Sequence, residues 1–267
     1  MNLYVKELRS HFKSLVIWSV CIFLMVLLGM IEYEGYSSSG QSINDVMGEM
    51  PQALQAVMGI SDMDLSKASG YYGLLYLYLL LMTTIHAAML GAVMIAKEER
   101  DKTTEFLFVK PISRTKIITT KLLAAFTNIV ILNIVTLVSS ITLVGMYSGD
   151  EAVNGDILMT MAGMFFLQLI FLVFGSALAA VKKQSKRASS LAAGVLLLTY
   201  LLSVAIDLND RIEMLKYLTP FKYFEAKNIM FGGGFENIFV LLSVVLIAGL
   251  TVVTFVFYKK RDLNVAL

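Results

Sequence analysis

Residues that could carry out covalent chemistry are scarce in this sequence. It contains two histidines, His11 and His86, and one cysteine, Cys21. The metalloprotease motif HExxH, the nucleophile motif GxSxG and the Walker A phosphate-binding motif are all absent. A single cysteine also excludes an intrachain disulfide and a multi-cysteine zinc site. We therefore expect no enzyme activity, no metal site and no cofactor bound by this chain itself.

Polar residues inside long apolar runs are the next candidates for a function. His86 lies midway along one such run, and Asn133 and Gln168 lie in two others. Polar groups are costly in lipid, so they often line a substrate path, but they also join helices through hydrogen bonds worth about 0.6 kcal/mol each. Both interpretations stay open for these three residues. No Asp, Glu, Lys or Arg lies near the centre of these runs, which argues against an ion-coupled carrier.

A strongly charged segment, residues 98–114, carries the most informative pattern. Its apolar residues Phe106, Leu107 and Val109 form one small face of a short helix, which we expect to begin near Thr103 or Thr104 and to end before Pro111. Such a helix could dock onto a soluble partner, and an ordinary amphipathic connector is the alternative. The candidate docking residues are Glu98, Glu99, Thr103, Thr104, Glu105, Leu107, Pro111, Ser113 and Arg114.

The composition is that of an integral membrane protein. Of 267 residues, 57% are hydrophobic and 16% are charged, with a mean hydropathy of +0.74, whereas an average soluble domain has about 25% charged residues. The net charge of +2 gives no indication of nucleic-acid binding. We expect one all-α membrane domain over residues 1–267, because six apolar runs are long enough to cross a bilayer as helices. These predicted spans are residues 15–31, 71–96, 122–146, 157–181, 188–206 and 238–258.

The distribution of basic residues predicts the orientation of the chain in the membrane. Most of the 22 Lys and Arg residues lie on the side of the spans that holds both termini and residues 97–121. The connections on the opposite side carry more acidic than basic residues. Because basic loops stay on the cytoplasmic side, we expect both termini and the charged segment in the cytoplasm. No cleavage site follows the first run, so we expect it to be retained as a span.

Three segments outside the spans have a recognisable pattern. Residues 2–14 read as a short amphipathic helix at the inner membrane surface, or as a basic anchor that only sets orientation. Residues 46–58 predict a helix on the outer side, with Asp45 as its cap. Residues 207–236 are too apolar for a free loop and are interrupted by Pro220. They predict either two short helices that dip into the membrane or an interfacial aromatic belt.

The charged segment resembles the signature that follows the second span in ABC-2-type transporter permeases. The residues that carry the resemblance are Glu98, Glu99, Thr104, Glu105, Leu107, Pro111, Ile112, Ser113, Arg114 and Lys121. Many relatives have a glycine where this chain has Thr103. The six spans, the apolar segment around Pro220 and the basic tail at Lys260 and Arg261 resemble the family as well.

This resemblance implies the membrane subunit of an ATP-driven exporter in a bacterial plasma membrane. In that family the charged segment forms a short cytoplasmic coupling helix that docks onto a separate ATPase, which binds ATP and Mg²⁺. Two permeases pair, so the partners would be ABC ATPase subunits and a second copy or a paralogue. A peptide, an antibiotic or a lipid-like molecule would be the cargo. The alternative function is an accessory or immunity subunit that docks a cytoplasmic partner without transporting anything.

Overall fold

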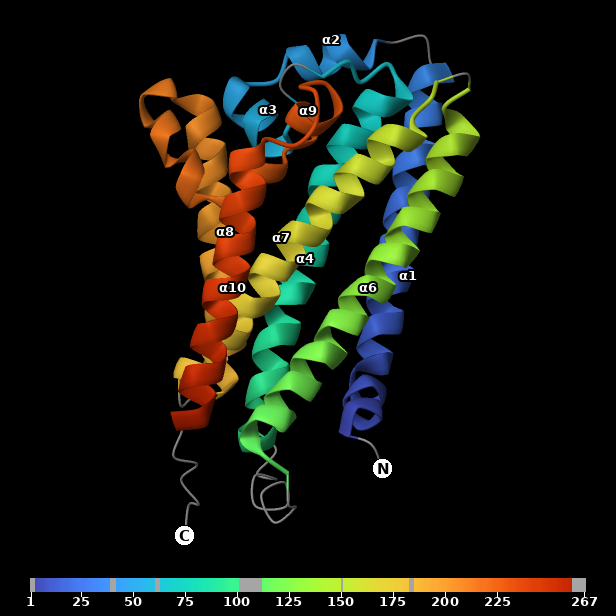
Figure 1. Cartoon of the computed structure of the whole chain (residues 1–267). Helices are drawn as coiled ribbons and strands as arrows, with labels where there is room; N and C mark the ends of the chain where they lie inside the picture. The colour runs from blue at the N-terminus through green and yellow to red at the C-terminus, as the bar shows by residue number, and fades with distance from the viewer. Residues whose placement is uncertain are drawn as a thin grey trace.

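The computed structural model describes residues 3–38, 42–60, 63–100, 112–149, 151–182 and 185–260, and over these ranges it contains helices and no strands. Six of the helices in these ranges are long and apolar enough to cross a membrane. They are α1 (Leu3–Ser38), α4 (Ala68–Arg100), α6 (Arg114–Tyr147), α7 (Asn154–Val181), α8 (Ser185–Leu208) and α10 (Asn237–Lys260) (Figure 1). Each predicted span lies inside one of these helices, so the prediction of an all-α fold with six candidate spans is confirmed.

The two ends of the helix bundle differ in structure (Figure 1). We call one end the base; there α1, α6 and α8 begin, and α4, α7 and α10 end. We call the other end the cap, because short helices cover it. These are α2 (Ile43–Gly48), α3 (Gln52–Met58), η1 (Asp210–Leu218), η2 (Pro220–Phe224) and α9 (Ala226–Met230).

Helix α4 is the centre of the bundle. It packs against α7 along much of its length and also contacts α1, α6 and α8. In the most apolar 18-residue stretch of α4, 72% is buried inside the protein, whereas in the corresponding stretch of α10 only 17% is buried. The peripheral helices α1, α8 and α10 therefore leave broad apolar faces exposed, which suits a lipid environment.

The contact between α4 and α7 depends on two glycines. A Cβ atom added to Gly91 would lie 2.1 Å from the carbonyl oxygen of Leu172, and one added to Gly175 would lie 2.1 Å from that of Ala88. The two backbones are therefore in direct contact at Gly91 and Gly175, where no side chain separates the helices. Small residues allow this approach in membrane proteins, where packing rather than the hydrophobic effect holds helices together.

The N-terminal segment is helical, as predicted, but it does not form a separate surface helix. Leu3–Ser38 is one continuous helix of 36 residues. At about 1.5 Å per residue it is about 54 Å long, which exceeds the ~30 Å hydrocarbon core of a bilayer. The amphipathic segment is therefore an extension of the first span beyond the apolar layer.

The cap differs from the prediction in one segment and agrees with it in another. The single helix expected over residues 46–58 is two helices, because Pro51 separates α2 from α3. Asp45 is not the cap; Ser42 is, and its side chain accepts a hydrogen bond from the Asp45 amide. Pro220 does break the last cap segment, as predicted, since it begins η2 directly after η1.

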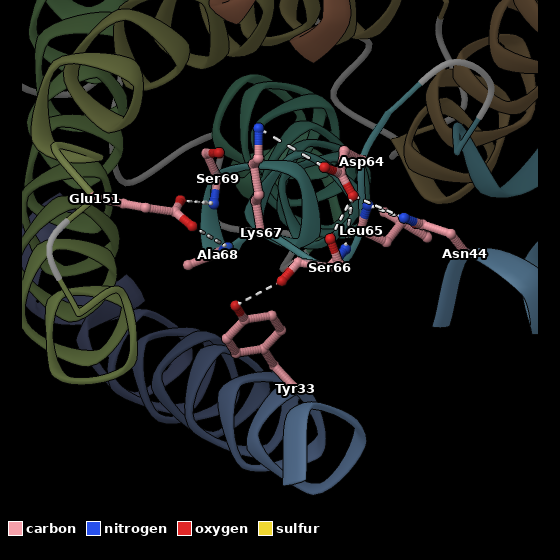
Figure 2. A network of polar contacts seen from close by, with 9 residues as sticks. All are labelled: Tyr33, Asn44, Asp64, Leu65, Ser66, Lys67, Ala68, Ser69 and Glu151. Carbon is pink, nitrogen blue, oxygen red and sulfur yellow. Dashed lines mark hydrogen bonds and ion pairs between the residues drawn. The ribbon is translucent and has the colours of Figure 1, made fainter. Parts of the chain in front are cut away.

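A network of hydrogen bonds connects the cap to the start of α4 (Figure 2). Asp64 Oδ1 accepts hydrogen bonds from Asn44 Nδ2 at 2.7 Å and from Ser66 Oγ at 2.6 Å. These two donors hold the pKa of the Asp64 carboxyl below its usual value. Glu151, from the connection between α6 and α7, accepts hydrogen bonds from the Ala68 and Ser69 amides. Its charge thereby stabilises the free N–H groups at the beginning of α4.

The α4–α7 contact predicts a sharp difference between two glycine substitutions. In Gly175→Ala the new methyl group meets the Ala88 backbone, so we expect a loss of about 1–3 kcal/mol of stability from overpacking. Gly249→Ala in α10 is the control, because no heavy atom lies within 4 Å of its Cβ position. Thermal unfolding of the two purified variants measures the effect. Equal melting temperatures would contradict the close backbone contact.

Candidate functional site

The predicted docking segment is described only at its two ends. Glu98 and Glu99 belong to the last turns of α4, and the structure describes their backbone only. Ser113 and Arg114 stand at the beginning of α6, and their side chains are described. The other predicted docking residues lie outside the described residues: Thr103, Thr104, Glu105, Leu107 and Pro111. The predicted coupling helix itself is therefore not tested.

Ser113 and Arg114 both fix the beginning of α6. The Ser113 side chain accepts a hydrogen bond from the Lys116 amide at 3.3 Å, so it is the N-cap of this helix. The Arg114 guanidinium donates to the carbonyl oxygen of Lys259 at 2.9 Å. A positive charge at the end of α10 also suits the dipole of that helix. The beginning of α6 is therefore hydrogen-bonded to the end of α10, the last span.

A buried group of charges lies beside the two ends of the segment, and we call it the base junction. The Glu7 carboxylate of α1 lies 3.2 Å from Lys97 Nζ of α4 and 3.8 Å from Lys121 Nζ of α6. Lys121 Nζ also donates to the Met94 carbonyl oxygen at 2.6 Å, and Lys97 Nζ donates to Ser10 Oγ at 2.7 Å. Glu7 and Lys121 are 1% and 0% exposed. Three long helices therefore meet on one carboxylate.

The energetics of the base junction follow from its burial. Burying these charges is costly, and the cost is offset only when opposite charges and hydrogen bonds satisfy them together. Here one carboxylate lies between two ammonium groups, and a backbone carbonyl and a hydroxyl accept further hydrogen bonds from them. The arrangement favours one relative position of α1, α4 and α6.

Sequence reasoning missed the base junction. The family resemblance includes Lys121, but no pattern in the sequence pairs it with Glu7. The available signal was that Glu7 is the one acidic residue among the first 31. A lone carboxylate in a basic segment next to a span is a candidate for a buried ion pair.

An apolar cluster lies next to the base junction, and residues of all six long helices contribute to it. Buried residues of α4, α6, α7, α8 and α10 form it, and Leu3 of α1 and Ile112, just before α6, pack against it. Its buried members are Ala92, Ile95, Ala96, Ile117, Ile118, Ala179, Ala180, Ala188 and Tyr258. A displacement of residues next to Ile112 therefore acts on a tightly packed group rather than on a free loop.

The three predicted path residues lie midway along their helices, and the structure joins two of them. Asn133 Nδ2 of α6 donates to Gln168 Oε1 of α7 and also to the Ile129 carbonyl oxygen at 3.0 Å. His86 of α4 instead contacts Trp18 of α1, with ring centroids 5.1 Å apart. Asn133 and Gln168 thus form a hydrogen bond between helices, as one of the two interpretations expects. A role in a substrate path stays a prediction for all three.

The cap contains a cavity of about 660 Å³, which we call the cap cavity. It lies between α3, α4, α8, η1, η2 and α9 and the start of α10, and charged and aromatic side chains line it together. Lys222 pairs with Asp207 and with Glu225 in its wall. Burial raises the pKa of the Glu225 carboxyl, against the opposing effect of the Lys222 ammonium. A pocket of this size suits a small organic molecule.

Comparison with known proteins identifies the family of this chain. A family model described as ABC-2 family transporter protein matches residues 1–263. No protein with a curated description matches the chain. The family match includes the base junction, the charged segment and the cap, so it covers every feature described above.

Neutralising Glu7 tests the base junction. In Glu7→Gln the carboxylate that offsets Lys97 and Lys121 is lost, so we expect a loss of roughly 3 kcal/mol of stability. Glu34→Gln removes an exposed carboxylate from the same helix and serves as the control. Thermal unfolding in detergent compares the two variants. A Glu7→Gln protein as stable as Glu34→Gln would show that the junction contributes nothing to the fold.

Proposed function

Because the chain belongs to the ABC-2 family of transporter proteins, we propose that it is the permease subunit of an ATP-driven exporter. The family and the six apolar helices make it a multi-pass transporter membrane subunit. Beyond this, we propose that transport is directed outward and that a separate ATPase subunit binds the ATP and Mg²⁺. The observation that carries the proposal is that the family's charged segment joins two helices, α4 and α6, that meet at the base junction.

In this proposal the base faces the cytoplasm. The beginnings of α1 and α6 and the ends of α4 and α10 lie at the base, and most of the basic residues lie in these helix ends and in the sequence next to them. The cap segments are richer in acidic residues. Basic segments are retained on the cytoplasmic side, so a soluble ATPase would find its docking site at the base.

The ATPase would act on the bundle through residues 98–114. ATP-driven closure of the ATPase displaces the segment, and the displacement passes to both of its ends. One end is the last turn of α4, which carries Lys97, and the other is Ile112 and Arg114 at the start of α6. The ion pairs of Glu7 extend the displacement to α1, and the Arg114 hydrogen bond extends it to α10.

A second permease copy, or a paralogue, would complete the transporter. A partner helix would cover part of the exposed apolar faces of α1, α8 and α10 in place of lipid. His86, Asn133 and Gln168 stay candidates for the path of the cargo. The proposal places the assembly in the cell membrane, where the cap would face the exterior.

Charge reversal in the segment tests the coupling. We expect Glu105→Arg to lose at least about tenfold of the ATPase activity that co-purifies with the tagged permease in mild detergent, because like charges facing each other in an interface cost several kcal/mol. Glu49→Arg, an exposed residue of the cap, is the matched control and should retain that activity.

Two outcomes would contradict the proposal. Full ATPase activity with Glu105→Arg would remove the segment from the coupling mechanism. If no ATPase co-purifies with the unaltered protein in any mild detergent, an accessory or immunity subunit would explain the family membership better.

A further inference from the structure

The cap cavity extends from the surface of the cap into the apolar layer of the bundle. Its lining includes Gln52 and Asp210 from the cap helices, and Tyr76, Leu77 and Leu80 from α4. A rise of ~1.5 Å per residue places Leu80 about 18 Å along α4 from Ala68, where the helix begins. The cavity therefore offers a polar entrance and an apolar depth to the same ligand.

The two tyrosines that line the cavity, Tyr76 and Tyr200, have hydroxyl groups that are already hydrogen-bonded. Tyr76 donates its hydroxyl hydrogen bond to the Phe224 carbonyl oxygen at 3.1 Å, and Tyr200 donates to the Val57 carbonyl oxygen at 2.5 Å. Tyr76 is only 1% exposed, whereas Tyr200 is partly exposed, so the ring of Tyr200 rather than its hydroxyl group is left to interact with a ligand. Ring faces accept apolar groups and also attract cations.

The charges around the cavity favour a cation. Among the described residues that line it, carboxylates outnumber ammonium groups five to three: Asp207, Asp210, Glu213, Glu225 and Glu236 against Lys216, Lys222 and Lys227. Lys222 is paired with Asp207 and Glu225, and Lys216 with Glu213. Within the ranges that the structure describes, the Asp210 side chain forms neither an ion pair nor a hydrogen bond, and Glu236 attracts the Lys216 ammonium only from beyond ion-pair distance, since Lys216 contacts Glu213.

We propose that the cap cavity binds an amphipathic cation, such as a hydrophobic amine or a quaternary ammonium compound. The apolar body lies against Leu77 and the ring of Tyr200, which are both partly exposed, and the cationic head lies near Asp210 and Glu236. An anionic headgroup fits less well, because the Lys216 and Lys222 ammonium groups are already paired with carboxylates. The role of this ligand as exported cargo rests on the proposed function, whereas its binding does not.

Binding of tetraphenylphosphonium tests the proposal directly. The purified permease is placed in nanodiscs of phosphatidylcholine, which carries no net charge, and saturable binding is measured by equilibrium dialysis against empty nanodiscs. We expect saturable binding by the unaltered protein and at least about tenfold weaker binding by Asp210→Asn/Glu236→Gln, a loss that corresponds to about 1.4 kcal/mol. Triphenylphosphine oxide, a neutral molecule with similar rings, should bind more weakly than the cation.

Two further variants separate charge from shape. Asp45→Asn/Glu49→Gln removes the same number of exposed cap carboxylates away from the cavity, and it should bind the cation normally. Leu77→Trp fills the apolar part without changing the charge, and it should weaken binding while thermal unfolding confirms that the variant is folded. Loss of binding in the Asp45→Asn/Glu49→Gln control to the same extent would show a general surface-charge effect and overturn the proposal.

The remaining outcomes are distinguishable from failure of the proposed function. Absence of saturable cation binding, or preferred binding of dodecyl sulfate, would overturn the cavity assignment and leave the ATPase coupling untouched. Normal cation binding by a protein with which no ATPase co-purifies would support the cavity assignment and contradict the exporter.

Discussion

The rest of the structure depends on the direct backbone contact between α4 and α7. In lipid, apolar side chains gain little by leaving the solvent, so helices associate through close packing. Gly91 and Gly175 allow this packing, because any side chain at either position would collide with a carbonyl oxygen of the other helix. The other long helices then arrange themselves around this pair, with α4 contacting α1, α6 and α8 and with α10 packed on α7.

The position of α4 links this packing to the proposed mechanism. The helix that holds the bundle together runs from the wall of the cap cavity to the charged segment at the base. In the proposed mechanism, a force applied at Glu98 and Glu99 acts directly on α4, because both residues belong to that helix. The base junction adds α1 and α6 to the same unit, because buried opposite charges resist separation. The proposed docking site at the base and the proposed ligand site at the cap would thus be connected through α4.

The sequence predicted the features that depend on runs of residues, and it missed those that depend on contacts between distant residues. Six spans follow from apolar length, and the break at Pro220 follows from the chemistry of proline. The base junction joins Glu7 to Lys121, and no local pattern shows that these residues meet. The division of the helix expected over residues 46–58 follows from Pro51, because proline lacks the amide hydrogen that a continuous helix needs at this position. The pairing of Asn133 with Gln168, and the separate contact of His86 with Trp18, required the packed structure.

The most direct test of the central claim is site-specific photo-crosslinking in intact cells, with p-benzoylphenylalanine in place of Phe106 in the charged segment or Leu54 in the cap. We expect the residue at position 106 to crosslink to a polypeptide that mass spectrometry identifies by its Walker A motif. The residue at position 54, which is exposed in α3, should not reach that polypeptide. Crosslinking of the ATPase from the cap position, or from neither position in cells that contain it, would contradict docking at the base.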